Sequence, residues 1–179
     1  MRLFVAAVVP APVVTVLSDL PRPPAAPVRW TTPAQWHVTL RFVGSVGDHR
    51  ALSAALAGLP GILGAKGVTS VRAELGPATQ WFPGRRVLQV PVVGLDDLAA
   101  AVSQATRGWC SPPAEPYRGH LTVARARGHG PGPAALAGSR LSATWPVEAV
   151  VLYSSTPSPT GPRYETLEQV ALARHEHPR

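Results

Sequence analysis

The hydrophobic and polar positions of this chain change their period several times, and each change predicts a new element. Residues 2–9 are almost continuously apolar and rich in valine, which predicts a buried strand. Apolar and polar residues alternate over 35–43 and again over 119–125, as in strands with one buried face. Helical spacing of apolar residues predicts three helices, at 11–20, 48–59 and 95–108.

The rest of the pattern predicts an α+β fold with mostly antiparallel sheets. Further strands are expected at 67–76, 86–93, 146–155 and 164–173, and a short helix at 133–138. The segments between these elements are rich in proline and glycine, as loops are, at 21–27, 77–85, 110–118 and 156–162. Each half of the chain contains one alternating strand with a histidine. We therefore expect one domain over 1–179 with two lobes, flanking helices and a central cleft, in which the terminal strands return to the first half.

Composition fits a globular protein of the reducing cytoplasm. The 179 residues are 45% hydrophobic, enough for one sizeable core. Cys110 is the only cysteine, so no intramolecular disulfide can form. The apolar segment 3–14 is interrupted by Pro10 and Pro12, which is unlike a signal peptide, and no stretch is long enough to span a membrane. We expect a cytoplasmic monomer.

The net charge of +7 is almost entirely due to arginine, because Lys66 is the only lysine. Guanidinium groups bind phosphate through two parallel hydrogen bonds, and excess positive charge attracts polyanions. A GC-rich genome also encodes much arginine, alanine, glycine and proline regardless of function. The charge alone therefore does not distinguish a nucleic-acid-binding protein from other classes.

The two alternating strands carry the same pattern, His-x-Thr-x. His37 and Thr39 are two positions apart, as are His120 and Thr122. Alternation places each His–Thr pair on one face of its strand and the intervening apolar residues on the other. Two such strands side by side would line a cavity with two imidazoles and two hydroxyls.

Two histidines suit phosphodiester cleavage. Imidazole titrates near pH ~6.5, so one ring can be a neutral base while the other is a protonated acid. Cleavage needs a base to activate the attacking oxygen and an acid to protonate the departing one. Threonine hydroxyls can donate hydrogen bonds to the phosphoryl oxygens, and a guanidinium can offset the developing charge.

These motifs resemble those of the 2H phosphoesterase superfamily, and within it the RNA 2′,3′-cyclic phosphodiesterases, historically called 2′-5′ RNA ligases. The resemblance spans nearly the whole chain: MRLFVA at 1–6, WHVTLRFVG at 36–44, WFPGRR at 81–86, RGHLTVARARG at 118–128 and VVLYSSTPSPTGPRYETL at 150–167. It implies a bilobed fold, a substrate that is RNA or a nucleotide ending in a 2′,3′-cyclic phosphate, hydrolysis to a 2′-phosphomonoester, and reversible 2′-5′ ligation in some members. Because an acid and a base together suffice for this hydrolysis, we expect no metal and no cofactor.

The resemblance also implies roles for individual residues. His37 would donate a proton to the leaving 3′ oxygen, and His120 would accept a proton from water. Thr39 and Thr122 would bind the phosphate oxygens. Arg125, the fifth residue after His120, would be the phosphate-binding arginine. Strict alternation points Arg125 away from His120, so this role requires the strand to bulge, twist or end there.

Other residues near the motifs are candidates for substrate contact. Arg41 shares the face of His37 by strict alternation, although deeper along the strand. An aromatic ring near the site could stack on a base or contact the ribose, and Trp36, Trp81, Phe82 and Tyr164 are the candidates. For any one of them, packing in the core or anchoring of a loop is the more common role.

The remaining histidines and the cysteine do not suggest further chemistry. His49 is expected at a helix start, His129 in a glycine-rich loop, and His175 and His177 in a polar tail. No acidic residue lies at ligand spacing beside either His-x-Thr, so no metal site is predicted. Cys110 has no neighbouring histidine and is expected to be an inert thiol.

Two other functions remain compatible with the same residues. The site could act mainly as a 2′-5′ RNA ligase or on another cyclic phosphate. The chain could also be an RNA-binding module that binds a 3′ end without turnover, although binding alone would require arginine more than a pair of titrating histidines.

Overall fold

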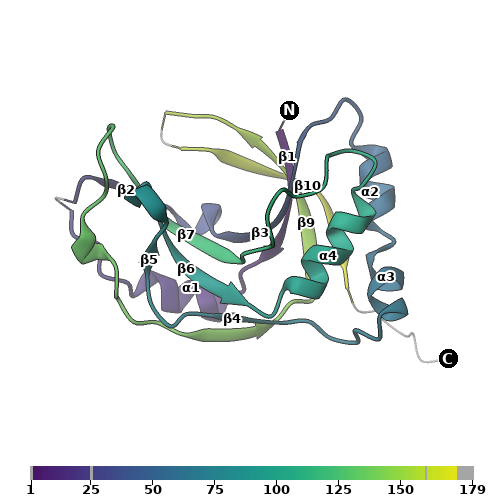
Figure 1. Cartoon of the computed structure of the whole chain (residues 1–179), viewed down its shortest axis with the longest axis horizontal. Coiled ribbons are helices and arrows are strands. Elements are labelled where there is room, and N and C mark those ends of the chain that lie inside the picture. The colour runs from purple at the N-terminus through teal and green to yellow at the C-terminus, as the bar shows by residue number, and fades with distance from the viewer. Residues whose placement is uncertain (1, 25, 160, 173–179) are drawn as a thin grey trace.

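The computed structural model describes residues 2–24, 26–159 and 161–172 (Figure 1). The α-helices are α1 (Ala11–Ser18), α2 (Arg50–Leu56), α3 (Leu59–Ala65) and α4 (Asp96–Ala105). The strands are β1 (Arg2–Val8), β2 (Val28–Trp30), β3 (His37–Ser45), β4 (Arg72–Leu75), β5 (Gln80–Trp81), β6 (Val87–Val93), β7 (His120–Ala126), β8 (Ala143–Pro146), β9 (Ala149–Thr156) and β10 (Arg163–Ala171). Three short 3-10 helices lie at Pro33–Gln35, Pro83–Arg85 and Ala134–Leu136.

The strands form one antiparallel sheet with a narrow waist, which confirms the α+β prediction. The strand order is β10-β9-β1-β3-β7-β6-β4-β8, with β2 on β7 and β5 on β6. At the waist, β3 and β7 are paired at one position only, Val38 opposite Leu121. The expected two sheets are therefore continuous, and the two histidine strands are neighbours at their junction.

The two halves of the sheet are built from different parts of the chain. β9 and β10, near the end of the chain, pair with β1 and complete the half that contains β3. The helices α2, α3 and α4 lie together at one end of the molecule (Figure 1), and α4 packs on α3 and on β3. Alternate residues of β1 enter the core, where Leu3, Val5 and Ala7 are fully buried.

The helix expected at 48–59 is α2, which ends at Leu56. A further helix, α3, begins at Leu59 where the expected helix ends, and it was not predicted. Pro60 lies in the first turn of α3, where a missing backbone N–H removes no hydrogen bond. Among the described residues, no helix has the length and apolar character needed to cross a membrane.

Several predicted strands also have different bounds. The strand expected at 146–155 is β9, which begins at Ala149, whereas β8, which ends at Pro146, was not predicted. The strand expected at 67–76 is limited to Arg72–Leu75, and the helix expected at 133–138 is a single 3-10 turn. The short strands β2 and β5 were not predicted, because two or three residues between prolines show no readable period.

Candidate active site

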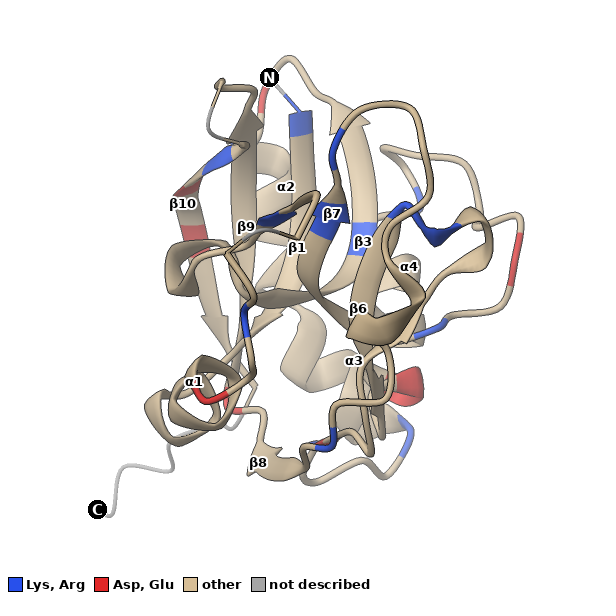
Figure 2. Cartoon of the chain, turned by 90° about the vertical axis from the view of Figure 1, so that its left-hand side faces the viewer, with Lys and Arg blue, Asp and Glu red and all other residues tan. Residues whose placement is uncertain are grey.

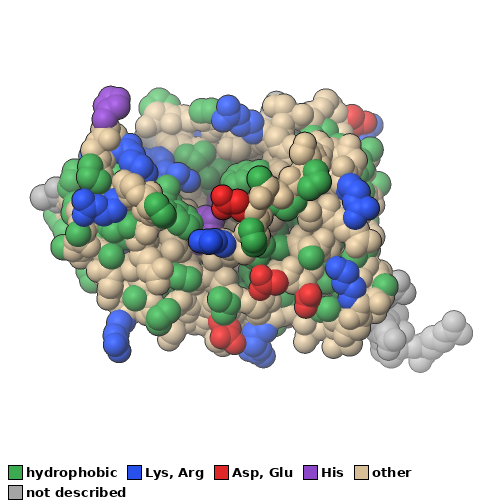
Figure 3. Space-filling view, in the orientation of Figure 1, with side chains coloured by type: hydrophobic (Ala, Val, Ile, Leu, Met, Phe, Trp, Pro, Cys, Tyr) green, Lys and Arg blue, Asp and Glu red, His purple; other side chains and the backbone are tan. Residues whose placement is uncertain are grey.

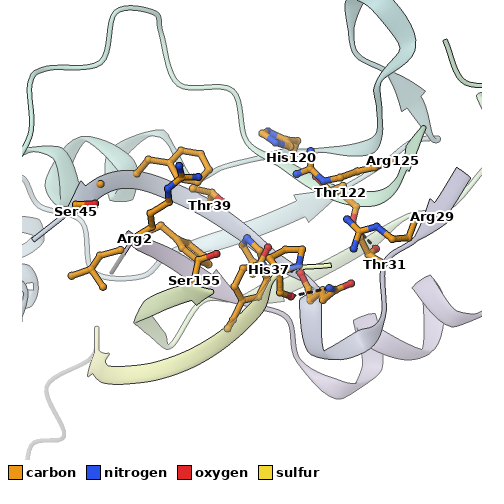
Figure 4. Close-up of a pocket in the computed structure, with 17 residues that line it drawn as sticks. Arg2, Arg29, Thr31, His37, Thr39, Ser45, His120, Thr122, Arg125 and Ser155 are labelled. Atoms are coloured by element: carbon orange, nitrogen blue, oxygen red, sulfur yellow. Dashed lines mark hydrogen bonds between the residues drawn. The ribbon is translucent and has the colours of Figure 1, made fainter. Parts of the chain in front are cut away.

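A cavity of about 330 Å³ lies over the junction of β3 and β7 and is lined by residues from both halves of the sheet. His37 and Thr39 enter it from β3, and His120 and Thr122 enter it from β7. Figure 4 shows these side chains directed into the same space, and Figure 3 shows a hollow on this face with basic side chains at its rim. The structure thus brings together the four residues of the two motifs.

Both imidazole rings are held in the same way. The Nδ1 atom of His37 lies 2.8 Å from the carbonyl oxygen of Gln35, and Nδ1 of His120 lies 2.9 Å from that of Arg118. A carbonyl oxygen only accepts hydrogen bonds, so each Nδ1 carries the hydrogen. In the neutral ring, Nε2 is then an unprotonated acceptor that is available to a substrate.

A bulge in β3 changes which residues face the cavity. Thr39 is opposite Ala6 and Arg41 is opposite the adjacent Val5, so Leu40 is an extra residue in β3. Beyond a bulge, the side chains of a strand exchange faces. Phe42 therefore lines the cavity, whereas Arg41 is directed away from it.

The prediction that Arg41 shares the site is therefore wrong. Its side chain is only 8% exposed and lies on the opposite side of β3. The guanidinium Nε donates a hydrogen bond to Sγ of Cys110 at 3.3 Å, and Nη2 donates to the carbonyl of Ser111. Arg41 lines a separate cavity next to α4 that does not include either motif histidine.

β7 has the same irregularity at the same place in its motif. Thr122 is opposite Gln89 and Ala124 is opposite the adjacent Leu88, so Val123 is the extra residue. The bulge turns Arg125 into the cavity. The irregularity that the phosphate-binding role of Arg125 requires is present.

Hydrogen bonds from β2 and the following turn hold this bulge. The backbone N–H of Thr31 donates to the carbonyl of Val123, and the Thr31 hydroxyl lies 2.9 Å and 3.0 Å from the carbonyls of Thr122 and Val123. The indole N–H of Trp36 donates to the same hydroxyl oxygen at 2.9 Å. Trp36 is 6% exposed and does not line the cavity, so its predicted base contact is wrong; it supports the bulge instead.

The other predicted aromatic contacts have different outcomes. Tyr164 lines the cavity, with its ring 5.0 Å from that of His37. The ring of Phe82 packs edge-on against His120 at 4.8 Å but does not line the cavity. Trp81 donates its indole N–H to the carbonyl of Pro133 and anchors a loop.

Several lining residues with polar or aromatic side chains were not predicted from the sequence: Arg2, Phe4, Arg29, Thr31, Gln35, Phe42, Ser45 and Ser155. One signal could have revealed Phe42. It is the fifth residue after His37, as Arg125 is after His120, so a bulge inferred for one copy applies equally to the other. The others come from positions that lack a recognisable pattern.

The electrostatic environment of the cavity is strongly positive. Arg2, Arg29 and Arg125 line it, and no carboxylate of the described residues does. In Figure 2, basic residues appear on β7 and at the start of β1, while the acidic ones lie on β10, on the helices and in loops. An anionic ligand would meet attraction from several sides.

The pKa of His37 is lowered from 6.5 to about 4. The main cause is burial, and the positive charges of His120 and Arg125 lower the pKa further, against a raising effect of the hydrogen bond with Gln35. Phe4 contributes to this burial, because its ring lies 4.9 Å from the imidazole. His37 is therefore neutral at pH 7 in the free protein.

The other histidines do not join this site. His129 is exposed, and His49 lies at the start of α2 outside the cavity. His175 and His177 lie outside the described residues. Within the described part of the chain, no three His, Cys, Asp or Glu side chains are grouped as a metal site would require.

The chain is similar to proteins of one enzyme family over its whole length. It is 31% identical over 195 residues to the RNA 2′,3′-cyclic phosphodiesterase of Thermus thermophilus, and the match covers 100% of this chain and 93% of that protein. No family model matches the chain.

Solved structures show the same fold. The crystal structure of TT0787 from Thermus thermophilus matches with a TM-score of 0.73 and 24% identity, covering 98% of this chain and 100% of that one. Escherichia coli LigT complexed with 3′-AMP matches with a TM-score of 0.66 and 26% identity, covering 97% and 98%. The full-length identity to the curated phosphodiesterase, together with this shared fold, shows that the chain belongs to the 2H phosphoesterases, in the RNA 2′,3′-cyclic phosphodiesterase (2′-5′ RNA ligase) family.

Proposed function

We propose that this protein hydrolyses the 2′,3′-cyclic phosphate at an RNA 3′ end to a 2′-phosphomonoester, with His37 and His120 as the acid–base pair and without a metal. The observation that carries the proposal is one cavity whose described lining contains both imidazoles, both threonines and three arginines, but no carboxylate. The curated relative is named for this activity, and LigT has been solved with 3′-AMP. We further propose a single two-lobed domain that acts as a cytoplasmic monomer.

In the proposed reaction, water attacks the phosphorus while the bond between phosphorus and the 3′ oxygen breaks. Nε2 of His120 accepts a proton from the water, and Nε2 of His37 donates a proton to the 3′ oxygen. The hydroxyls of Thr39 and Thr122 and the guanidinium of Arg125 donate hydrogen bonds to the phosphoryl oxygens, which stabilises the charge that develops there. Exchange of protons with solvent then restores both rings.

The low pKa of His37 places a condition on its role as the donor. A donor must be protonated before the reaction, and His37 is neutral at pH 7 in the free protein. A bound phosphate next to the ring favours the charged form of His37 and raises its pKa. We therefore expect His37 to become protonated when the substrate binds. In the reverse assignment, the neutral His37 would be the base.

A substrate with a good leaving group separates the two assignments. p-Nitrophenolate departs without protonation, so hydrolysis of an aryl phosphodiester needs the base but not the acid. If His37 is the donor, His37→Ala loses activity on the cyclic phosphate but retains it on the aryl ester, whereas His120→Ala loses both. The opposite pattern would reverse the roles of the two residues.

Product analysis tests the proposed function itself. In excess EDTA, the wild-type protein should convert an oligonucleotide ending in a 2′,3′-cyclic phosphate to one ending in a 2′-phosphate. His120→Ala should lower this rate by roughly 10²–10⁴-fold, the usual effect of losing one acid–base group. Loss of wild-type activity on chelation would refute the metal-free mechanism. A joined strand as the main product would favour the ligase, and binding without any product would favour an RNA-binding module.

A further inference from the structure

The cavity extends beyond the catalytic groups to a second basic end. Figure 4 shows Arg2, Ser45 and Ser155 on one side of Thr39, and His120 and Arg125 on the other. Arg2 is opposite Ser45 in β3 and opposite Ser155 in β9, so all three belong to one row of the sheet. Among the described residues that line the cavity there is no carboxylate, so none of them offers Arg2 an acidic partner.

The backbone of this end lies in a different row of the sheet from the motif residues. Thr39 is opposite Ala6, and Arg2 lies four residues earlier in β1. At a rise of ~3.3 Å per residue, the two rows are roughly 13 Å apart. Arg29 is in a different position, because it is directly opposite Arg125 and therefore lies beside the catalytic phosphate site.

An exposed aromatic ring lies between the catalytic row and Arg2. Phe42 lines the cavity and is 72% exposed, the largest exposed fraction among the large hydrophobic side chains that the structure describes. Its ring packs on one side against Phe4, with the ring centres 6.0 Å apart. An exposed ring beside a positively charged groove is the arrangement on which a nucleobase stacks.

We infer that this end of the cavity binds the terminal nucleoside and the phosphodiester on its 5′ side, with the base on Phe42 and the phosphodiester at Arg2. The inference rests on the proposed function, because a chain ending in a cyclic phosphate has its next phosphate only on the 5′ side. The terminal ribose then lies between the two phosphates, and its base projects from C1′ toward Phe42. The site therefore favours the ends of oligonucleotides over free cyclic nucleotides.

Two substrates that differ in one group test this inference. Adenosine 2′,3′-cyclic phosphate with a free 5′-hydroxyl is compared with the same compound carrying a 5′-methylphosphate ester, which supplies the phosphodiester without a second base. The wild-type protein should have a kcat/KM about tenfold higher for the ester. Arg2→Gln should abolish this preference, whereas Arg2→Lys should keep part of it.

Phe42→Ala should lower kcat/KM for both substrates alike, by about tenfold, and Phe42→Tyr should retain it. Arg72→Gln is the matched control, because Arg72 is an exposed arginine on β4 outside the cavity. It removes the same charge and should leave the preference unchanged. The inference would be overturned by a wild-type protein without the preference, or by an equal loss on both substrates in Arg2→Gln. It would also be overturned if Arg72→Gln lost the preference or if Phe42→Ala had no effect.

Failure of the proposed function would be recognised separately, as absence of wild-type turnover on either substrate. Calorimetric binding of the two corresponding 2′-phosphates then tests the same end of the cavity without catalysis. The compound with the 5′-methylphosphate ester should bind about tenfold more tightly, and Arg2→Gln should remove the difference. Equal affinities of the wild-type protein for the two compounds would contradict the inference.

Discussion

Acidification should destabilise this protein through a single buried histidine. The pKa of His37 is about 4 in the folded protein, mainly because of burial, against 6.5 for an ordinary histidine. Between these two values the unfolded chain binds a proton that the folded chain does not. The free energy of unfolding therefore has its full value above pH 6.5 and falls as the pH is lowered toward 4.

The size of this effect follows from the two pKa values. With ~1.4 kcal/mol for each pH unit of difference, protonation of His37 should lower the free energy of unfolding by about 3 kcal/mol at pH 4. Stabilities of small proteins are roughly 5–15 kcal/mol, so this loss is readily measured. The aromatic rings of Phe4 and Tyr164, which enclose the imidazole, are the structural source of the shift.

Denaturant unfolding at a series of pH values measures this loss, and His37→Gln is the control because it removes the titrating group while the carboxylates remain. The wild-type protein should lose about 3 kcal/mol more than the variant between pH 6.5 and pH 4. NMR titration of the His37 ring gives the pKa directly, and inorganic phosphate should raise it. Parallel pH dependences of wild type and variant, or a ring that titrates at 6.5 or above without phosphate, would refute the reasoning.

Three further substitutions test separate parts of the site. Arg125→Gln should lower kcat/KM by roughly 10²-fold, as loss of a hydrogen-bond donor to the transition state does, and Arg125→Lys should recover part of the activity. An effect below threefold would show that Arg125 does not bind the reacting phosphate. Trp36→Phe removes the N–H that holds Thr31 at the bulge of β7. This should lower the free energy of unfolding by about 1 kcal/mol and should also lower kcat/KM. An unchanged kcat/KM would show that the bulge does not need this hydrogen bond. Arg41→Met should leave kcat/KM within twofold and change the free energy of unfolding by less than ~1 kcal/mol, because this buried charge contacts a thiol and a carbonyl and not the cavity. A large loss of kcat/KM would show that Arg41 does take part in the reaction.

Alternation along the two histidine strands predicted the core of the site. Period-two patterning placed each histidine and its threonine on one face, and the structure directs both pairs into one cavity. The same rule failed just beyond Thr39 in β3, because it assumes an uninterrupted strand. The bulge at Leu40 reverses the faces, which removes Arg41 from the cavity and introduces Phe42.

The remaining differences come from contacts between segments distant in sequence or hidden in the core. Trp36 was a candidate for base contact because it precedes His37, but its indole is bonded to Thr31 in the core. Arg2 reaches the cavity only because β1 lies between β3 and β9. Neither arrangement leaves a local pattern in the sequence. Strand periodicity and the repeated motif are local patterns, so the elements that depend on them could be predicted.

The central claim is that two imidazoles from the two halves of the sheet act on one phosphorus atom. A crystal structure of the protein with inorganic phosphate tests this most directly. The account predicts one phosphate whose oxygens accept hydrogen bonds from the Thr39 and Thr122 hydroxyls and from Arg125, with Nε2 of both His37 and His120 within hydrogen-bond distance. A phosphate bound by only one of the two histidines, or bound outside this cavity, would contradict it.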